Sequence, residues 1–219
     1  MEKNNNNVNV ISLFSTPVLV TNIGRDFTKD ELQLLLSDIP MWKDISTGEP
    51  NHRSKELCLF DKFADNKGLK DIKSFCEQQF DFYLKEIEGI DTNIAGLKIT
   101  QSWLNVNKPG EYHHIHTHPN SYLSGILYIK CLPDDYINLE KPSQMPSITI
   151  HFPIKKMTQW NTTGIRQTIT EGDLILLPSW IPHYVNVNET KETRVSFAFN
   201  TFPIGEMGKY SSVSQLFLK

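Results

Sequence analysis

From about residue 97 onward, the chain is a succession of short strand-like segments with no helical pattern between them. The segments are rich in Ile, Val, Phe, Tyr and Thr, and turn-forming groups such as Pro-Gly and Glu-Gly-Asp separate them. The predicted strands are 97–106, 111–116, 122–131, 147–152, 165–170, 173–178, 183–188 and 193–201. Eight short strands in a row predict two packed sheets, which is a mainly β fold of the jelly-roll type.

The first part of the chain has a mixed pattern. Two short strands are predicted at 11–14 and 18–23, on either side of a proline break. The segment 43–64 shows no clear period and is interpreted as a long loop with a strand near 57–60. In the second half, the segment 132–146 holds three prolines and several charges, and we expect a surface loop there.

Two helices are predicted to flank the sheets. Thr28 and Glu31 have the spacing of a capping box, and this predicts a short helix that ends before Pro40. The strongest helical pattern runs over 65–87 and stops near Gly89. Its apolar residues recur at steps of three and four and form one stripe: Leu69, Ile72, Cys76, Phe80, Tyr83, Leu84 and Ile87. We expect this stripe to pack against the sheets.

The organisation that follows is a single domain over residues 1–219. Residues 1–96 are a mixed strand and helix region that supports a jelly-roll core over residues 97–203. The chain shows no internal repeat and no linker rich in Pro or Ser. A chain of this length can bury a sizeable core without disulfides.

Charge and cysteine content narrow the setting of the protein. Lys and Arg number 22 against 25 Asp and Glu, so the net charge is −3, which excludes a general nucleic-acid binder. The three cysteines are odd in number and widely spaced, which indicates reduced thiols in the cytoplasm. No segment has the pattern of a signal peptide or a membrane span. The expected partners are small molecules, and the chain could also form a homodimer.

Histidine carries the chemical information in this sequence. Four of the seven histidines lie in the run His113-His114-Ile115-His116-Thr117-His118. Side chains alternate between faces along a strand, so His114, His116 and His118 should share one face and His113 the other. Two imidazoles two residues apart can bind one metal ion. His183, which follows a predicted strand and a Pro-rich turn, is the best third ligand.

The residues around these histidines follow a characteristic order. His116-Thr-His118-Pro-Asn120 is followed by Ser124-Gly-Ile-Leu-Tyr128, then by Gly172-Asp-Leu-Ile-Leu-Leu-Pro178 before His183, and then by Arg194-Val-Ser196. This order resembles the Fe(II)/2-oxoglutarate-dependent oxygenase superfamily. It is most similar to the prolyl-hydroxylase-like branch, and within it to a subfamily from phages and marine bacteria. The resemblance covers about residues 97–203 and implies a double-stranded β-helix, bound Fe(II) and 2-oxoglutarate as cosubstrate.

A second resemblance is to the cupins, which share this type of β-helix. The spacing Gly110-x5-His116-x-His118 matches the start of the first cupin motif. The second motif is matched by Gly172 and His183, apart from a tryptophan in the place of a glycine. Both resemblances imply the same three metal ligands, namely His116, His118 and His183.

The sequence departs from the usual oxygenase pattern at one ligand. His118 stands where the oxygenases have an acidic residue, and the chain contains no His-x-Asp or His-x-Glu. A carboxylate ligand gives iron one negative charge, whereas three neutral imidazoles give none. An alternative in which His114 and His116 are the paired ligands stays open. With His118 as the ligand, His114 becomes a pocket residue.

Arg194 is the residue that distinguishes the oxygenase interpretation from the cupin interpretation. On the strand 193–201, Arg194, Ser196 and Ala198 should share one face, and Val195, Phe197 and Phe199 the other. An unpaired buried arginine is costly, and the distal carboxylate of 2-oxoglutarate would pair with it. The oxygenase resemblance therefore implies Arg194 as the cosubstrate anchor, with Tyr128, Ser124 and Ser196 as hydroxyl donors. The alternative is an edge-strand arginine paired with an acid such as Glu192.

The resemblance implies an Fe(II)- and 2-oxoglutarate-dependent oxygenase that hydroxylates an unidentified substrate, for example a peptide or an amino acid. One alternative is a three-His cupin-type dioxygenase that does not use 2-oxoglutarate. Another is a metal-binding jelly roll without enzymatic activity. Four further residues are weaker candidates for a substrate pocket: Asn105, Asn107, His114 and Trp180.

Overall fold

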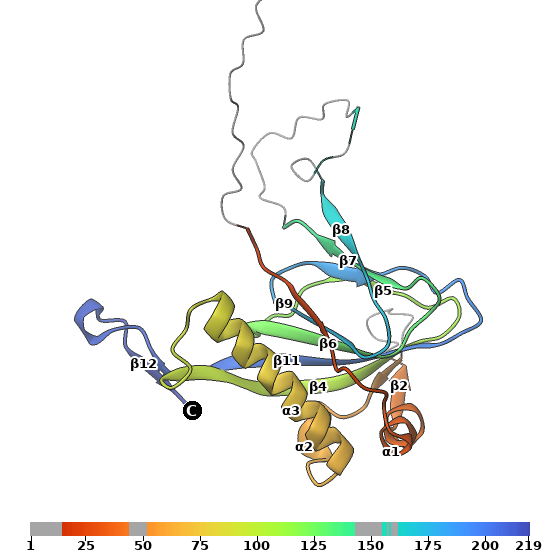
Figure 1. The fold of residues 1–219 in the computed structure, drawn as a ribbon, viewed down its shortest axis with the longest axis horizontal. Helices are drawn as coiled ribbons and strands as arrows, with labels where there is room; N and C mark the ends of the chain where they lie inside the picture. The colour runs from red at the N-terminus through yellow and green to blue at the C-terminus, as the bar shows by residue number, and fades with distance from the viewer. Residues whose placement is uncertain (1–14, 44–51, 143–154, 157, 159–161) are drawn as a thin grey trace, which may run out of the picture.

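The computed structural model describes residues 15–43, 52–142, 155–156, 158 and 162–219, and it consists mainly of two antiparallel sheets (Figure 1). The larger sheet has eight strands in the order β1-β9-β6-β11-β4-β3-β2, with β12 paired to β11. The smaller sheet has the order β5-β10-β7-β8. This confirms the predicted fold class of a mainly β chain with flanking helices.

The strands have the following bounds. In the larger sheet they are β1 (Leu19–Asn22), β2 (Met41–Lys43), β3 (His52–Ser54), β4 (Ala95–Asn107), β6 (Leu123–Lys130), β9 (Asp173–Pro178), β11 (Arg194–Met207) and β12 (Leu216–Leu218). In the smaller sheet they are β5 (His113–His116), β7 (Tyr136–Glu140), β8 (Gly164–Thr168) and β10 (His183–Val185).

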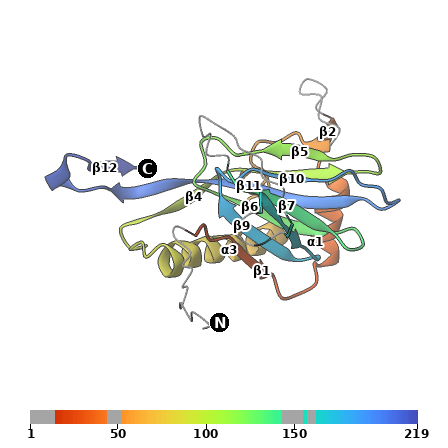
Figure 2. The same cartoon turned by 90° about the horizontal axis from the view of Figure 1, so that it is seen from above.

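The helices lie on one side of the larger sheet (Figures 1 and 2). Helix α1 (Lys29–Gln33) has the expected capping box between Thr28 and Glu31 and continues as a π-helical turn to Asp38. Helix α3 (Lys67–Phe82) continues in the same way to Ile87. Its apolar stripe packs on the sheet from Leu69 to Leu84, whereas Ile87 at the end of the predicted stripe is 40% exposed. Gly89 follows with φ +69°. No helix in the described ranges is long and apolar enough to span a membrane.

The larger sheet is buried on both faces, so its two faces belong to two apolar clusters. On the helix side, Leu127, Phe197 and Phe199 pack with α3 in the larger cluster. On the other side, Ile126 and Ile175 pack against Ile137 and other residues of the smaller sheet. Strand β6 is therefore buried at every position except Lys130, as expected of a strand covered on both faces.

Two predicted segments differ from the structure, and two lie outside the described residues. The segment near 57–60 is not a strand, because α2 (Leu59–Lys62) begins there; a short apolar run has no period that separates the two. The segment 132–146 is not only a loop, since it contains β7, whose central residues are buried. The strands predicted at 11–14 and 147–152 lie outside the described residues.

A glycine on β6 makes room for an aromatic ring of β11. Gly125 and Phe199 are directly opposite each other on these strands, and a Cβ atom at residue 125 would lie 2.1 Å from Cζ of Phe199. The Phe199 ring also packs near Phe80 of α3, with ring centroids 6.5 Å apart. The close packing of the larger cluster therefore depends on the missing side chain.

We expect Gly125→Ala to lower the free energy of unfolding by about 1–3 kcal/mol, because the added methyl group overpacks the core. Urea unfolding followed by fluorescence measures this change. Gly96→Ala on β4 is the matched control, since no atom lies within 4 Å of its Cβ position. Equal stability of the two variants would contradict the packing described for Phe199.

Candidate metal centre

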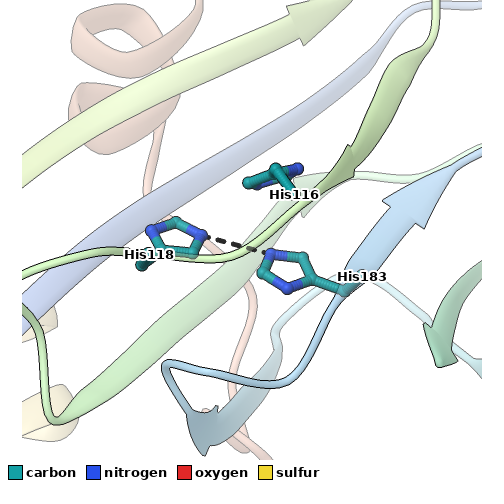
Figure 3. A group of neighbouring side chains, drawn as sticks. All are labelled: His116, His118 and His183. Atoms are coloured by element: carbon teal, nitrogen blue, oxygen red, sulfur yellow. Dashed lines mark hydrogen bonds between the residues drawn. The ribbon is translucent and has the colours of Figure 1, made fainter. Parts of the chain in front are cut away.

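Three histidines meet between the ends of β5 and β10 (Figure 3). His116 ends β5 and lies directly opposite His183, which begins β10, and His118 follows in the loop after β5. One ring nitrogen from each of the three lies within 4.8 Å of those of the other two. In the described part of the chain, this is the group of three residues with the spacing to hold a metal ion.

Hydrogen bonds orient each of the three rings. Nδ1 of His116 is 2.8 Å from the carbonyl oxygen of His114, and Nδ1 of His183 is 3.0 Å from that of Ile181. A carbonyl can only accept, so each Nδ1 carries the proton and donates it. The side chain of Asn200 hydrogen-bonds His118, although burial has the larger effect and lowers the pKa of that ring. The rings of His116 and His183 are thereby left with Nε2 free of hydrogen, the usual arrangement in histidines that bind metals.

The Nε2 atoms of His118 and His183 face each other. They are 3.2 Å apart (Figure 3), and Nε2 of His183 carries no hydrogen because Nδ1 of that ring holds the proton. Without a metal ion, Nε2 of His118 can donate a hydrogen bond to Nε2 of His183, and a bound metal ion would take the place of that proton. Metal–nitrogen bonds of about 2.1 Å place neighbouring ligand atoms about 3.0–3.4 Å apart. The observed spacing therefore fits a shared metal ion.

Burial keeps these imidazoles uncharged. It lowers the pKa of His183 to about 3 and that of His118 to about 4, and repulsion from neighbouring histidines adds to both shifts. At neutral pH both rings are therefore neutral imidazoles, the form of histidine that binds a metal ion.

The same shifts predict that the metal-free protein loses stability in mild acid. In the unfolded chain both pKa values return to about 6.5, so between pH 6.5 and pH 4 the unfolded state binds more protons. Stability is therefore present above about pH 6.5 and is lost as the pH falls, by about 2 kcal/mol per imidazole between pH 7 and pH 5. Urea unfolding at several pH values measures the slope, and His183→Gln should make it shallower. A slope unchanged by that substitution would contradict the assignment.

A bulge in β5 changes which histidines face the cavity. His116 pairs with His183, but His113 pairs with Val185, so four residues of β5 oppose three of β10. The prediction that His113 faces away is therefore wrong: its ring stacks on that of His116 at 4.1 Å and lines the same cavity. His114 is exposed and lies on a different hollow, although its backbone carbonyl holds the ring of His116.

Arg194 lies in the same cavity but already has an acidic partner. Its Nε donates to Oδ2 of Asp135 at 2.7 Å and its Nη2 donates to Oδ1, so the pair is bidentate and buried. The expectation that burial of Arg194 requires a bound dicarboxylate is therefore wrong, because Asp135 already balances its charge. Glu192 is not its partner and pairs instead with Lys130. The third guanidinium nitrogen of Arg194, Nη1, is buried and has no partner in the described residues.

The other predicted site residues divide into two groups. Five of them line the cavity with the three histidines: Asn105, Asn107, Tyr128, Arg194 and Ser196. Ser124 and Trp180 do not. Ser124 is buried behind the site, where its hydroxyl donates to Oδ1 of Asn200 at 3.0 Å, and Trp180 is 54% exposed. Ser124 is therefore linked to His118 through hydrogen bonds to Asn200.

Sequence reasoning missed three residues at this site. His113 was assigned to the wrong face because the bulge depends on the partner strand. Asp135 lies in a segment interpreted as a surface loop, where nothing marked one acid as buried. Asn200 could have been found, because a polar amide interrupts the apolar strand β11 and is 5% exposed.

Comparison with known proteins relates this geometry to one group of enzymes. Residues 101–200 match a family described as "Putative 2OG-Fe(II) oxygenase". No curated protein sequence matches the chain.

Solved structures share the fold at low sequence identity. An oxidoreductase of the 2OG-Fe(II) oxygenase family from Burkholderia pseudomallei is 12% identical with a TM-score of 0.54, over 84% of either chain. HygX from Streptomyces hygroscopicus, solved with nickel, 2-oxoglutarate and hygromycin B, is 15% identical with a TM-score of 0.50, over 85% of this chain and 83% of its own. A prolyl-4-hydroxylase from Pseudomonas putida is 10% identical with a TM-score of 0.53, over 86% and 94%. The likeness shows the double-stranded β-helix fold, and with the family match it supports the 2OG-Fe(II) oxygenase superfamily.

Proposed function

We propose that the protein is an Fe(II)- and 2-oxoglutarate-dependent oxygenase of the prolyl-hydroxylase-like branch, which hydroxylates a substrate such as a peptide or an amino acid. The observation that carries the proposal is the cluster of His116, His118 and His183, in which the Nε2 atoms of His118 and His183 are 3.2 Å apart in a cavity that a buried arginine also lines. The family match and the fold support the same conclusion.

The residues present fit the groups that the proposal requires. His116, His118 and His183 would hold the iron, which together with 2-oxoglutarate supplies the oxidation of a C–H bond by O2. Nη1 of Arg194 is a buried donor with no acceptor in the described residues, and it lines the cavity where the distal carboxylate would lie. Ile126 and Ile137 also line the cavity, and an apolar lining favours a site with little water.

The direct test is turnover of 2-oxoglutarate. Purified protein with Fe(II), O2 and 2-oxoglutarate should release succinate, even slowly and without a second substrate. A set of candidate peptides and amino acids that accelerates this release would then identify the substrate class. Absence of both succinate release and 2-oxoglutarate binding would contradict the proposal.

A second function is favoured by one observation, the lack of a carboxylate among the three clustered residues. A three-His dioxygenase binds its substrate directly to iron and needs no 2-oxoglutarate. Under that alternative, the protein binds metal and consumes O2 with a substrate but forms no succinate. A protein that binds metal and shows neither reaction is a binding module.

His118→Asp separates the two enzymatic functions. The change puts a carboxylate in the position where the oxygenases carry one, and we expect the variant to keep iron and the slow turnover of 2-oxoglutarate. A three-His dioxygenase should instead lose its activity, because its substrate is bound at a metal without a charged protein ligand. Succinate release and iron content measure the outcome, with His118→Ala as the control that should lose both.

A further inference from the structure

Two buried nitrogen atoms next to the histidines have no hydrogen-bond partner. Among the buried side-chain polar atoms of the described residues, these are Nη1 of Arg194 and Nδ2 of Asn107. Their side chains belong to residues that are 4% and 2% exposed, and both line the cavity of the three histidines. Buried donors are rarely left unpaired, because each costs free energy, so two in one cavity indicate a missing acceptor.

The two donors lie side by side in the sheet. Arg194 on β11 is directly opposite Asn107 on β4, so the two side chains emerge on the same face as cross-strand neighbours. Asn107 is held there because its backbone carbonyl accepts a hydrogen bond from Nδ2 of Asn188 at 3.1 Å. The missing acceptor is therefore one group that can accept from both nitrogens.

Asp135 determines which nitrogen Arg194 can offer. Its carboxylate takes Nε and Nη2, and it also accepts from the backbone N–H groups of Leu132 at 3.1 Å and Tyr136 at 2.9 Å. With its own orientation fixed in this way, Asp135 fixes the plane of the guanidinium. Arginine usually binds a carboxylate through two nitrogens at once, and in Arg194 Asp135 already occupies such a pair. Only Nη1 remains available to a ligand.

We infer that Asn107 and Arg194 together form a two-donor site for the distal carboxylate of 2-oxoglutarate, with Asp135 as the residue that positions the guanidinium. The inference rests on the proposed function. A carboxylate has two oxygens that only accept, which matches two neighbouring donors that lack acceptors. One oxygen takes Nη1 of Arg194, and the amide of Asn107 replaces the second arm of the occupied fork.

Asn107→Leu tests the inference, because Leu has a similar size and no donor. Titration of 2-oxoglutarate into the Ni(II) form, followed by calorimetry, should show affinity about tenfold or more below that of the wild type. Pyruvate, a 2-oxo acid without a distal carboxylate, should bind the two proteins equally. The metal-free variant should unfold at the same or a higher urea concentration, because an unpaired buried donor has been removed.

Asn107→Asp is the second variant, since its carboxylate brings an acceptor to Nη1 from within the protein. It should weaken 2-oxoglutarate binding more than the Leu variant does and should leave pyruvate binding unchanged. If wild type and both variants bind 2-oxoglutarate equally, the inference is wrong and the proposed function stands. If both ligands weaken together with stability, Asn107 is structural and the inference is wrong. Failure of the wild type to bind 2-oxoglutarate contradicts the proposed function and the inference together.

Discussion

His183→Ala and His116→Ala should each abolish metal binding. Each variant removes an imidazole whose Nδ1 proton is held by a backbone carbonyl, and it takes one member from the three clustered histidines that have the spacing to hold a metal ion. Even residues that only support a metal ligand change affinity about 10- to 100-fold, and loss of a ligand should exceed that range. Calorimetric titration with Ni(II), and metal content after dialysis against Fe(II), measure the effect.

His114→Ala is the matched control for this experiment. It removes an exposed imidazole from the same strand and keeps the backbone carbonyl that His116 uses. We expect this variant to bind metal as the wild type does. Full occupancy in both ligand variants would show that the triad is wrong, and loss of metal from His114→Ala would move the ligands to His114 and His116.

The second large effect concerns the buried pair of Arg194 and Asp135. Arg194→Ala leaves the carboxylate of Asp135 buried without its charge partner, and such a change costs about 3–5 kcal/mol. Domains are stable by about 5–15 kcal/mol, so this variant should be close to unfolding. Urea unfolding of Arg194→Ala and of Asp135→Ala measures the loss, and a change below about 1 kcal/mol in both would contradict the pairing.

A double variant separates the fold from ligand binding. Arg194→Met with Asp135→Asn removes both charges, while the amide oxygen of Asn can still accept from one of the two backbone N–H groups, Leu132 or Tyr136, that bind the carboxylate. It should fold better than Arg194→Ala and keep its metal ion, yet bind 2-oxoglutarate roughly 10- to 100-fold more weakly. Arg194→Lys should recover little, because an ammonium group cannot hold Asp135 by two bonds and also reach the ligand. Wild-type affinity in the double variant would exclude Arg194 as the anchor.

The elements that could be predicted are those in which the buried side chains are apolar and recur at a regular spacing in the sequence. Strand β9 was predicted with its observed bounds, and helix α3 was found from the stripe that contains Leu69 and Phe80. The alternation of Arg194 with Phe197 on β11 also indicated which side chains face the cavity, and the structure has this arrangement. Patterns of this kind can be recognised in one segment, without information about the strands that pair with it.

The remainder depends on contacts between segments that are far apart in the chain. The bulge of β5 arises only against β10, and it reverses the direction predicted for His113. The partner of Arg194 lies 59 residues earlier, in a segment where composition favoured a solvent-exposed loop. Asp135 differs from the exposed Asp134 beside it only in its tertiary contacts, so no local signal could separate them.

Strand β5, which carries His116 at its end, is also an edge strand. Among the described strands it pairs with β10 alone, and its register joins only two residue pairs. A metal ion shared by His116 and His183 would cross-link β5 to β10, much as an additional pair of backbone hydrogen bonds would. Without the ion, we expect the edge to open locally long before the helix-backed sheet does, with fast amide hydrogen exchange in β5 and slow exchange in β4 and β11. Occupancy of the site would thus decide whether the strand that builds it stays folded.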